Sequence, residues 1–110
     1  MKVYELSECM NCKSYGDSIA LDKEVHSLYI GDILSRVMSR TSDRQAWLTV
    51  QTHLNAVAVA LFKNLSCIVI LEDVAIPQET LDKAFEEHIA ILSTNLSAYE
   101  FVTRFNELID

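Results

Sequence analysis

Short runs of apolar residues alternate with segments of helical periodicity along most of this chain. The run at residues 67–71, Cys-Ile-Val-Ile-Leu, is continuously apolar and has polar residues on both sides. Such a run predicts a central strand of a parallel sheet, because a strand of that kind is buried on both faces. Aromatic and β-branched residues predict further strands, and these lie at residues 25–30, 46–50 and 89–92, with a short edge strand at 12–15.

The segments between these strands have the apolar spacing of helices. Residues 2–10 place their apolar positions on one stripe, whereas residues 53–63 are apolar on nearly every side. Asp32 is in position to cap a third helix. Pro77 suits the start of a fourth, since its missing N–H is not needed there, and Phe85 is expected to face inward from that helix.

The last helix carries its own start signal at residues 97–100. Their sequence, Ser-Ala-Tyr-Glu, has the spacing of a capping box, in which the first and last side chains bond free N–H groups at the helix start. The apolar stripe of this helix is expected to consist of Phe101, Val102, Phe105, Leu108 and Ile109. Residues 18–24 are interpreted as a connection without regular structure.

Strands and helices alternate after residue 24, which predicts an α/β fold with right-handed crossovers. We expect a three-layer sandwich with a mainly parallel sheet of four to five strands. The length of 110 residues suits one domain, with bounds 1–110.

Composition excludes several classes of protein. Half of the residues are hydrophobic, which excludes a disordered chain. The net charge is −7, and the loose cluster Arg36, Arg40 and Arg44 is best explained as a solvated helix face, so we expect no binding to nucleic acid. No apolar stretch approaches the ~18 residues of a membrane span, and the N-terminus lacks a signal sequence. These features predict a cytoplasmic protein without membrane contact.

Polar residues gather where the predicted strands end. The carboxyl ends of parallel strands share one edge of the sheet, and ligands of α/β proteins bind there. Amide, hydroxyl and imidazole groups near helix N-termini favour an anionic ligand. A capping role alone is the alternative, since these residue types are common in caps and turns. The predicted ligand-binding residues are Asp32, Ser35, Gln51, Thr52, His53, Asn55, Ser93 and Thr94.

Catalytic motifs do not stand out. Gly16 and Gly31 are the two glycines of the chain, so neither a Rossmann G-x-G-x-x-G nor a phosphate loop is present. His53 as a general base needs an orienting acid, for which Asp32 is a candidate. A small transferase or hydrolase that uses these two residues therefore remains an alternative. The main expectation is a protein without enzymatic activity, catalytic residues, bound metal or cofactor.

The cysteines allow a second alternative. Cys9 and Cys12 have C-x-x-C spacing, which suits a redox pair or half of a metal site, but neither a second pair nor a nearby histidine completes four ligands. Cys67 starts the central apolar run and is expected in the core.

Three motifs resemble the DRTGG domain family and cover most of the chain from residue 22 onward. The first comprises Asp-Lys-Glu-Val at 22–25 and Tyr-Ile-Gly-Asp-Ile-Leu-Ser at 29–35, continued by Val-Met at 37–38. The second is Trp-Leu-Thr-Val-Gln-Thr-His-Leu-Asn at 47–55, continued by Val-Ala-Val-Ala at 57–60. The third is Ile-Leu-Ser-Thr at 91–94 with Leu-Ser-Ala-Tyr-Glu at 96–100. The family's paired glycines are replaced by Ser27 and Leu28, and its arginine by Lys23.

The resemblance implies a regulatory module rather than an enzyme. Similar domains accompany CBS pairs in regulated pyrophosphatases, and the N-terminal domain of the histidine-phosphocarrier kinase is related. A nucleotide or phosphorylated ligand, a regulated enzyme partner, or both, are the implied binding partners. Stand-alone members occur near iron-only hydrogenase genes, and a redox or metal accessory role for Cys9 and Cys12 remains an alternative, although this cysteine pair is not a feature of the family.

The helix predicted at residues 53–63 further suggests a homodimer. A helix that is apolar all round is buried on more than one face, and a second copy of the chain can supply the extra cover. The predicted interface residues are Leu54, Val57, Ala58, Leu61 and Phe62.

Overall fold

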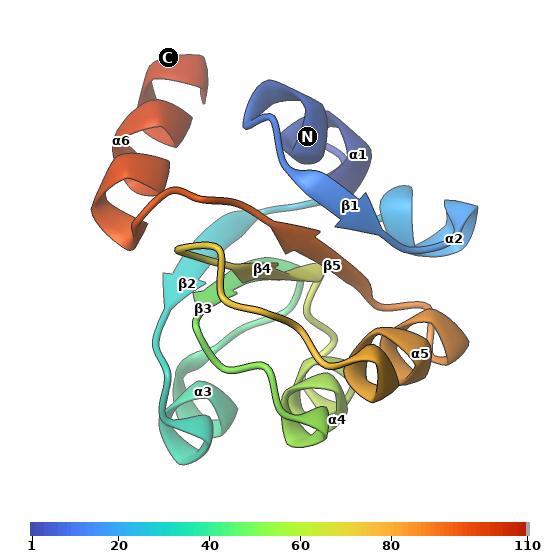
Figure 1. Ribbon diagram of the computed structural model, residues 1–110. Coiled ribbons are helices and arrows are strands. Elements are labelled where there is room, and N and C mark those ends of the chain that lie inside the picture. Colours follow the sequence, from blue (N-terminus) through green and yellow to red (C-terminus); the bar gives the residue numbers. More distant parts are fainter. Residues whose placement is uncertain (110) are drawn as a thin grey trace.

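A five-stranded sheet forms the middle layer of the computed structural model, which describes residues 1–109 (Figure 1). Its spatial order is β1-β5-β4-β3-β2. Strands β2 to β5 are parallel, and β1 pairs antiparallel with β5. The prediction of a mainly parallel sheet is therefore confirmed. The strand bounds are β1 Lys13–Tyr15, β2 Ser27–Ile30, β3 Gln45–Thr49, β4 Cys67–Ile70 and β5 Ala90–Ser93.

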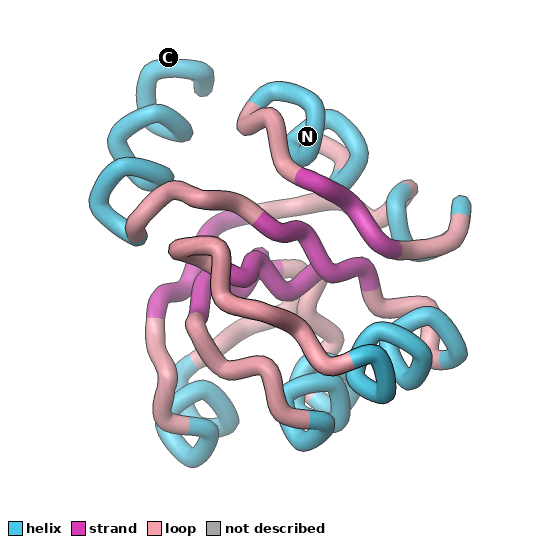
Figure 2. The backbone as a smooth tube through the Cα atoms, viewed as in Figure 1, coloured by secondary structure: helices cyan, strands magenta, loops and turns pink. Residues whose placement is uncertain are grey.

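Helices cover both faces of the sheet (Figure 2). One outer layer contains α1 (Val3–Cys9), α2 (Ser18–Leu21) and α6 (Ala98–Ile109). The opposite layer contains α3 (Leu34–Arg40), α4 (Leu54–Phe62) and α5 (Gln78–Glu86). This arrangement is the three-layer α/β sandwich expected from the sequence.

Alternate residues of the central strands serve two separate cores. On β4, Cys67 and Val69 pack on the face covered by α1, α2 and α6. Ile68 and Ile70 pack on the opposite face, beneath α3, α4 and α5. All four side chains are buried. Burial on both faces explains why this strand is an uninterrupted apolar run in the sequence.

Of the two predicted helix caps at α6 and α3, the first is confirmed and the second is wrong. The capping box before α6 is confirmed, since the N–H of Glu100 donates to Ser97 Oγ at 3.2 Å and the N–H of Ser97 donates to Glu100 Oε1 at 3.0 Å. These bonds hold the pKa of Glu100 below its ordinary value. The prediction that Asp32 caps α3 is wrong, because Ile33 is the N-cap and Asp32 bonds elsewhere.

Three further predictions need correction. Residues 18–24 contain the short helix α2, and the Asp17 carboxylate caps it by accepting the N–H of Ala20 at 2.9 Å. Phe85 does not face inward, since 57% of its surface is exposed. On α6, Phe101 is buried and packs in the core, but Leu108 and Ile109 are exposed.

Within residues 1–109, the helices are too short or too polar to cross a lipid bilayer.

Truncating a core side chain of β4 is expected to cost far more than truncating an exposed one of the same type. Ile68 is 1% exposed and Ile19 is 59% exposed. Ile68→Ala should lower the free energy of unfolding by about 2–5 kcal/mol, through lost apolar burial and the cavity it leaves. Ile19→Ala should change it by less than about 0.5 kcal/mol. Urea denaturation measures both, and equal losses would contradict the core described above.

Candidate functional site

The loops after β2 and β3 are joined by a network centred on Asp32. Its carboxylate Oδ1 accepts a hydrogen bond from the Thr49 hydroxyl at 2.8 Å and another from the Val50 N–H at 3.0 Å. The Gln51 side chain adds a third hydrogen bond between the two loops, since its Nε2 donates to the Asp32 carbonyl at 2.9 Å. Two predicted site residues, Asp32 and Gln51, are therefore in direct contact.

Thr49 and Trp47 complete this connection from within β3. The N–H of Gln51 donates to Thr49 Oγ1 at 3.1 Å, so the buried hydroxyl is shared by both loops. Trp47 is fully buried, and its Nε1–H donates to the Gly31 carbonyl at 2.8 Å. The sequence analysis did not identify Thr49 as a site residue. Its signal was modest: a single hydroxyl near the end of the otherwise apolar segment at residues 46–50.

His53 is the N-cap of α4 and is exposed. Its Nδ1 accepts the N–H of Asn55 at 3.0 Å, which places the proton of the neutral ring on Nε2. Because the side chain is exposed, its Nε2–H can serve as a donor to a ligand. The hydrogen bonds of the described residues do not join His53 to Asp32, so this pair lacks the geometry of a base with its orienting acid.

The remaining rim residues divide into anchors and exposed groups. The Thr52 carbonyl accepts the Thr80 hydroxyl at 2.8 Å, which ties this loop to α5. Thr94 is buried, and its hydroxyl accepts the N–H of Leu96 at 3.2 Å. A buried Thr94 side chain has little surface to offer a ligand. Ser35 and Asn55 are exposed on α3 and α4, and Ser93 is half-buried at the end of β5.

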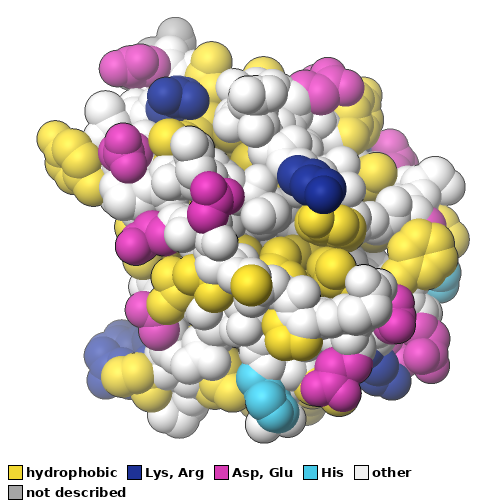
Figure 3. All heavy atoms as spheres, in the orientation of Figure 1, with side chains coloured by type: hydrophobic (Ala, Val, Ile, Leu, Met, Phe, Trp, Pro, Cys, Tyr) yellow, Lys and Arg dark blue, Asp and Glu magenta, His cyan; other side chains and the backbone are white. Residues whose placement is uncertain are grey.

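Glu72 and Asp73 form a strained turn beside this rim. Both are exposed and both adopt positive φ, 58° and 55°, which is uncommon for residues other than glycine. Their N–H groups donate to the carbonyls of Leu96 and Thr94 at 3.0 Å, and these bonds hold the turn. Together with Asp32 they place exposed carboxylates near the rim. Figure 3 shows further Asp and Glu side chains scattered over one face of the molecule.

The cysteines belong to no candidate metal-binding cluster within the part of the chain that the structure describes. Residues 1–109 contain no group of three His, Cys, Asp or Glu side chains that could hold a metal ion. Burial raises the pKa of Cys12 to about 11, so its thiol is protonated near neutral pH and is a poor nucleophile. Cys67 is buried in the core as predicted, and burial raises its pKa to about 12.

The predicted interface helix α4 exposes a narrow apolar stripe. Ala58, Leu61 and Phe62 are exposed, and Phe62 has 76% of its surface accessible. Val57 lies inside the core at 1% exposure and cannot contact a second copy, so this part of the interface prediction is corrected. Leu54 is half-buried. Much of the apolar character of α4 is explained by packing against the sheet and α5 rather than by a partner.

Comparison with known proteins supports the fold. Neither a family model nor a curated protein matches the chain. Among solved structures, the chain is similar to the crystal structure of the CBS and DRTGG domains of the regulatory region of Clostridium perfringens pyrophosphatase, complexed with its activator diadenosine tetraphosphate. The TM-score is 0.67, and the match covers 93% of this chain and 44% of that chain.

This similarity establishes the fold alone. The sequence identity is 6%, which shows a shared fold and not a shared family. The present chain also spans less than half of the matched chain. Membership of the DRTGG family, inferred from the three motifs, therefore stays a prediction, while the fold that the resemblance implied agrees with the structure.

Two substitutions at Asp32 test the network. Asp32→Ala removes the acceptor for the Thr49 hydroxyl and the Val50 N–H, and should lower the free energy of unfolding by about 1–3 kcal/mol. Asp32→Asn keeps an oxygen acceptor at the same place and should lose clearly less. Chemical denaturation distinguishes them. If both variants were as stable as the parent, the network would not hold the two loops together.

Proposed function

We propose that this chain is a non-catalytic regulatory module that binds a nucleotide or similar phosphorylated ligand and acts as a homodimer. The observation that carries the proposal is the fold similarity to a regulatory region whose crystal structure contains a nucleotide activator. Ligand binding at the rim then changes which arrangement of the dimer is populated, and a partner enzyme responds to that change.

The rim offers chemistry that suits the nucleoside part of such a ligand. Ser35, His53 and Asn55 present a hydroxyl, an imidazole N–H and an amide to solvent. Asp32 uses one carboxylate oxygen within the protein, and its other oxygen remains available for a ribose hydroxyl or a base amino group. Gln51 and Thr52 hold the loop that carries His53, so they position rather than contact the ligand.

The phosphate groups are best placed near the start of α4. The dipole of a helix N-terminus attracts negative charge, whereas Glu72 and Asp73 repel it. Phosphates therefore extend away from the strained turn and toward His53, the N-cap of α4.

The two alternative functions draw less support. A hydrolase or transferase needs His53 and Asp32 to act together, yet each is bonded to other groups. A redox or metal accessory role needs a reactive Cys9–Cys12 pair, but the raised pKa of Cys12 disfavours its thiolate.

A thermal-shift titration tests the proposal. A ligand that binds the native state raises stability by about 2.7 kcal/mol at 100 times its Kd, which is a rise in Tm of roughly 10 °C or more for a domain of this size. The probes are diadenosine tetraphosphate, ATP, GTP and inorganic phosphate. We expect at least one nucleotide to raise the Tm in a concentration-dependent manner.

The matched variants locate the site. His53→Ala should reduce the shift, since it removes an exposed donor from the rim. His26→Ala is the control, because His26 is also an exposed histidine. It directly precedes β2 and so lies at the amino ends of the parallel strands, whereas the rim lies at their carboxyl ends. A flat response to all four probes would reject a nucleotide ligand. Equal loss in both variants would place binding elsewhere.

A further inference from the structure

A pocket of about 400 Å³ lies at the amino ends of β2 and β3, on the edge of the sheet opposite the rim. It is lined by Ile19, residues 22–24, His26 and residues 43–44, and we refer to it as the amino-edge pocket. These residues come from α2, from the connection that leads into β2 and from the loop before β3. The fold thus brings three separate segments together at a hollow that shares no residue with the rim.

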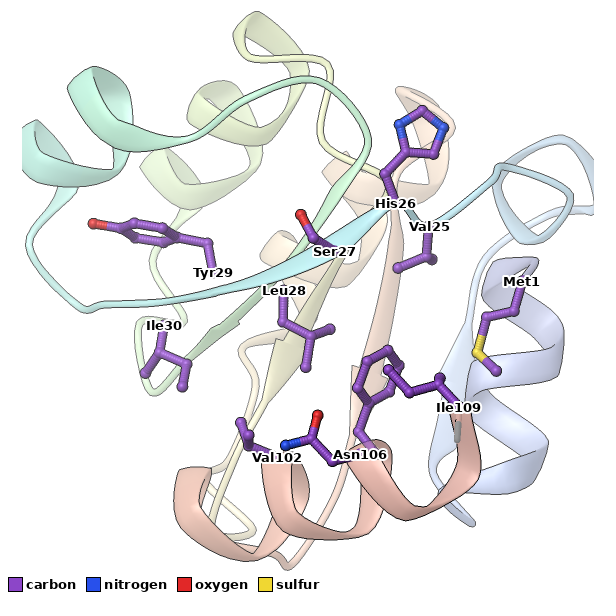
Figure 4. Close-up of a pocket in the computed structure, with 11 residues that line it drawn as sticks. Met1, Val25, His26, Ser27, Leu28, Tyr29, Ile30, Val102, Asn106 and Ile109 are labelled. Carbon is purple, nitrogen blue, oxygen red and sulfur yellow. The ribbon is translucent and has the colours of Figure 1, made fainter.

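The amino-edge pocket differs in character from the apolar groove of about 580 Å³ between β2 and α6 (Figure 4). His26 borders both hollows, and Figure 4 shows its imidazole pointing away from Leu28 and Val102, which line the groove. Most of the residues that line the amino-edge pocket are Asp, Glu, Lys or Arg, and Phe, Tyr and Trp are absent from its described lining. Because these aromatic side chains are the ones that stack on nucleobases, the pocket suits a small charged ligand rather than a nucleoside.

Lys23 is half-buried in this pocket, and a carbonyl rather than a carboxylate holds its ammonium group. Its Nζ donates to the His88 carbonyl at 2.7 Å, and two of its three N–H donors remain for a ligand. Burial, and next the charge of Arg44, lower the pKa of Lys23. The Asp17 carboxylate acts in the opposite direction, but it is already bonded to the Ala20 N–H and to the His88 ring. Two cations therefore lie close enough to destabilise each other.

Arg44 supplies the second positive charge and is also half-buried. Its backbone is fixed on both sides, since its N–H donates to the Asn64 carbonyl at 3.0 Å and its carbonyl accepts the His26 N–H at 2.8 Å. Among residues 1–109, the side-chain hydrogen bonds and ion pairs do not engage its guanidinium, and no ion pair includes Lys23. The five N–H donors of this guanidinium are therefore available to an anion.

The carboxylates that line the same pocket already have partners. Lys2 Nζ lies 3.4 Å from a carboxylate oxygen of Asp22 and 3.7 Å from one of Glu24. The Asp43 carboxylate accepts a hydrogen bond from the Asn64 side chain. These contacts offset part of the negative charge of the three acids, whereas the two cations of the pocket have no carboxylate partner among the described residues.

We propose that the amino-edge pocket binds a small phosphate dianion, either inorganic phosphate or the phosphate group of a small metabolite, between Lys23 and Arg44. A phosphate monoester carries a charge of about −1.5 to −2 at neutral pH, which matches two cations, whereas a monocarboxylate neutralises only one. The planar guanidinium can donate two parallel N–H bonds to phosphate oxygens, and the ammonium adds a point charge. This site goes beyond the proposed function, because it lies away from the rim and takes no nucleoside.

Amide NMR spectra of the chain, titrated with inorganic phosphate at constant ionic strength, test the site. We expect saturable shifts at residues 22–26 and 43–45. Lys23→Gln and Arg44→Gln should each weaken phosphate binding by about ten-fold or more, since each removes a charged hydrogen-bond donor. Lys23→Arg keeps the charge and should lose clearly less. Circular dichroism checks the fold of each variant, and Lys23→Gln carries the test if Arg44→Gln does not fold.

Arg40→Gln is the matched control, because it removes the same charge from an exposed residue at the end of α3, outside the pocket. Its Kd for phosphate should equal that of the parent chain. Acetate, with a single negative charge, should bind clearly more weakly than phosphate. Shifts that do not saturate, equal weakening in Arg40→Gln and Lys23→Gln, or equal affinity for acetate would overturn the proposal.

Glycerol 3-phosphate, titrated in the same way, distinguishes the two sources of the phosphate group. Tighter binding of glycerol 3-phosphate supports a small metabolite, and tighter binding of inorganic phosphate supports the free ion.

The same variants separate this site from the rim. His53→Ala should leave the phosphate-induced NMR shifts at residues 22–26 unchanged, and Lys23→Gln should leave the nucleotide-induced thermal shifts unchanged. Phosphate-induced shifts confined to residues 31–35 and 50–56 would overturn the amino-edge site. A flat thermal response to nucleotides, together with saturable phosphate shifts at residues 22–26, would reject the rim ligand and support the amino-edge site, so the two failures give different results.

Discussion

Burial of β4 on both faces is the constraint on which the rest of this structure depends. Its four side chains alternate between two cores, so helices must cover both sides of the sheet. Parallel neighbours joined by helical crossovers satisfy that requirement, and they bring the carboxyl ends of β2 to β5 to one edge. The rim with Asp32 and His53 exists because the strands share one direction.

Features with a local cause were predictable from the sequence. The apolar run at residues 67–71 identified the central strand, and the spacing of Ser97 and Glu100 identified the start of α6. His53 was placed correctly at the start of α4, since a polar residue before a long apolar helix marks the cap. For the two helix starts the deciding hydrogen bonds lie within a few residues along the chain, and for the strand the signal is the composition of the run itself.

Features that depend on distant partners were not predictable in this way. Asp32 looked like a helix cap, but its carboxylate is held by Thr49 and Val50 from the next strand. Phe85 has the spacing of an inward residue, yet it is exposed because the sheet is covered without it. The open edge of β2 depends on strand order, which follows from the packing of the whole sheet and not from residues 27–30 themselves.

Asp32 connects the rim to β2, since its carboxylate binds Thr49 and Val50 and its backbone lies directly after that strand. Amide hydrogen exchange with and without diadenosine tetraphosphate, read by mass spectrometry, tests that connection most directly. We predict increased protection at residues 31–35 and 50–56, accompanied by a change at residues 27–30 of β2. Protection confined to other segments, or none at saturating ligand, would contradict a ligand site at the rim that communicates through β2.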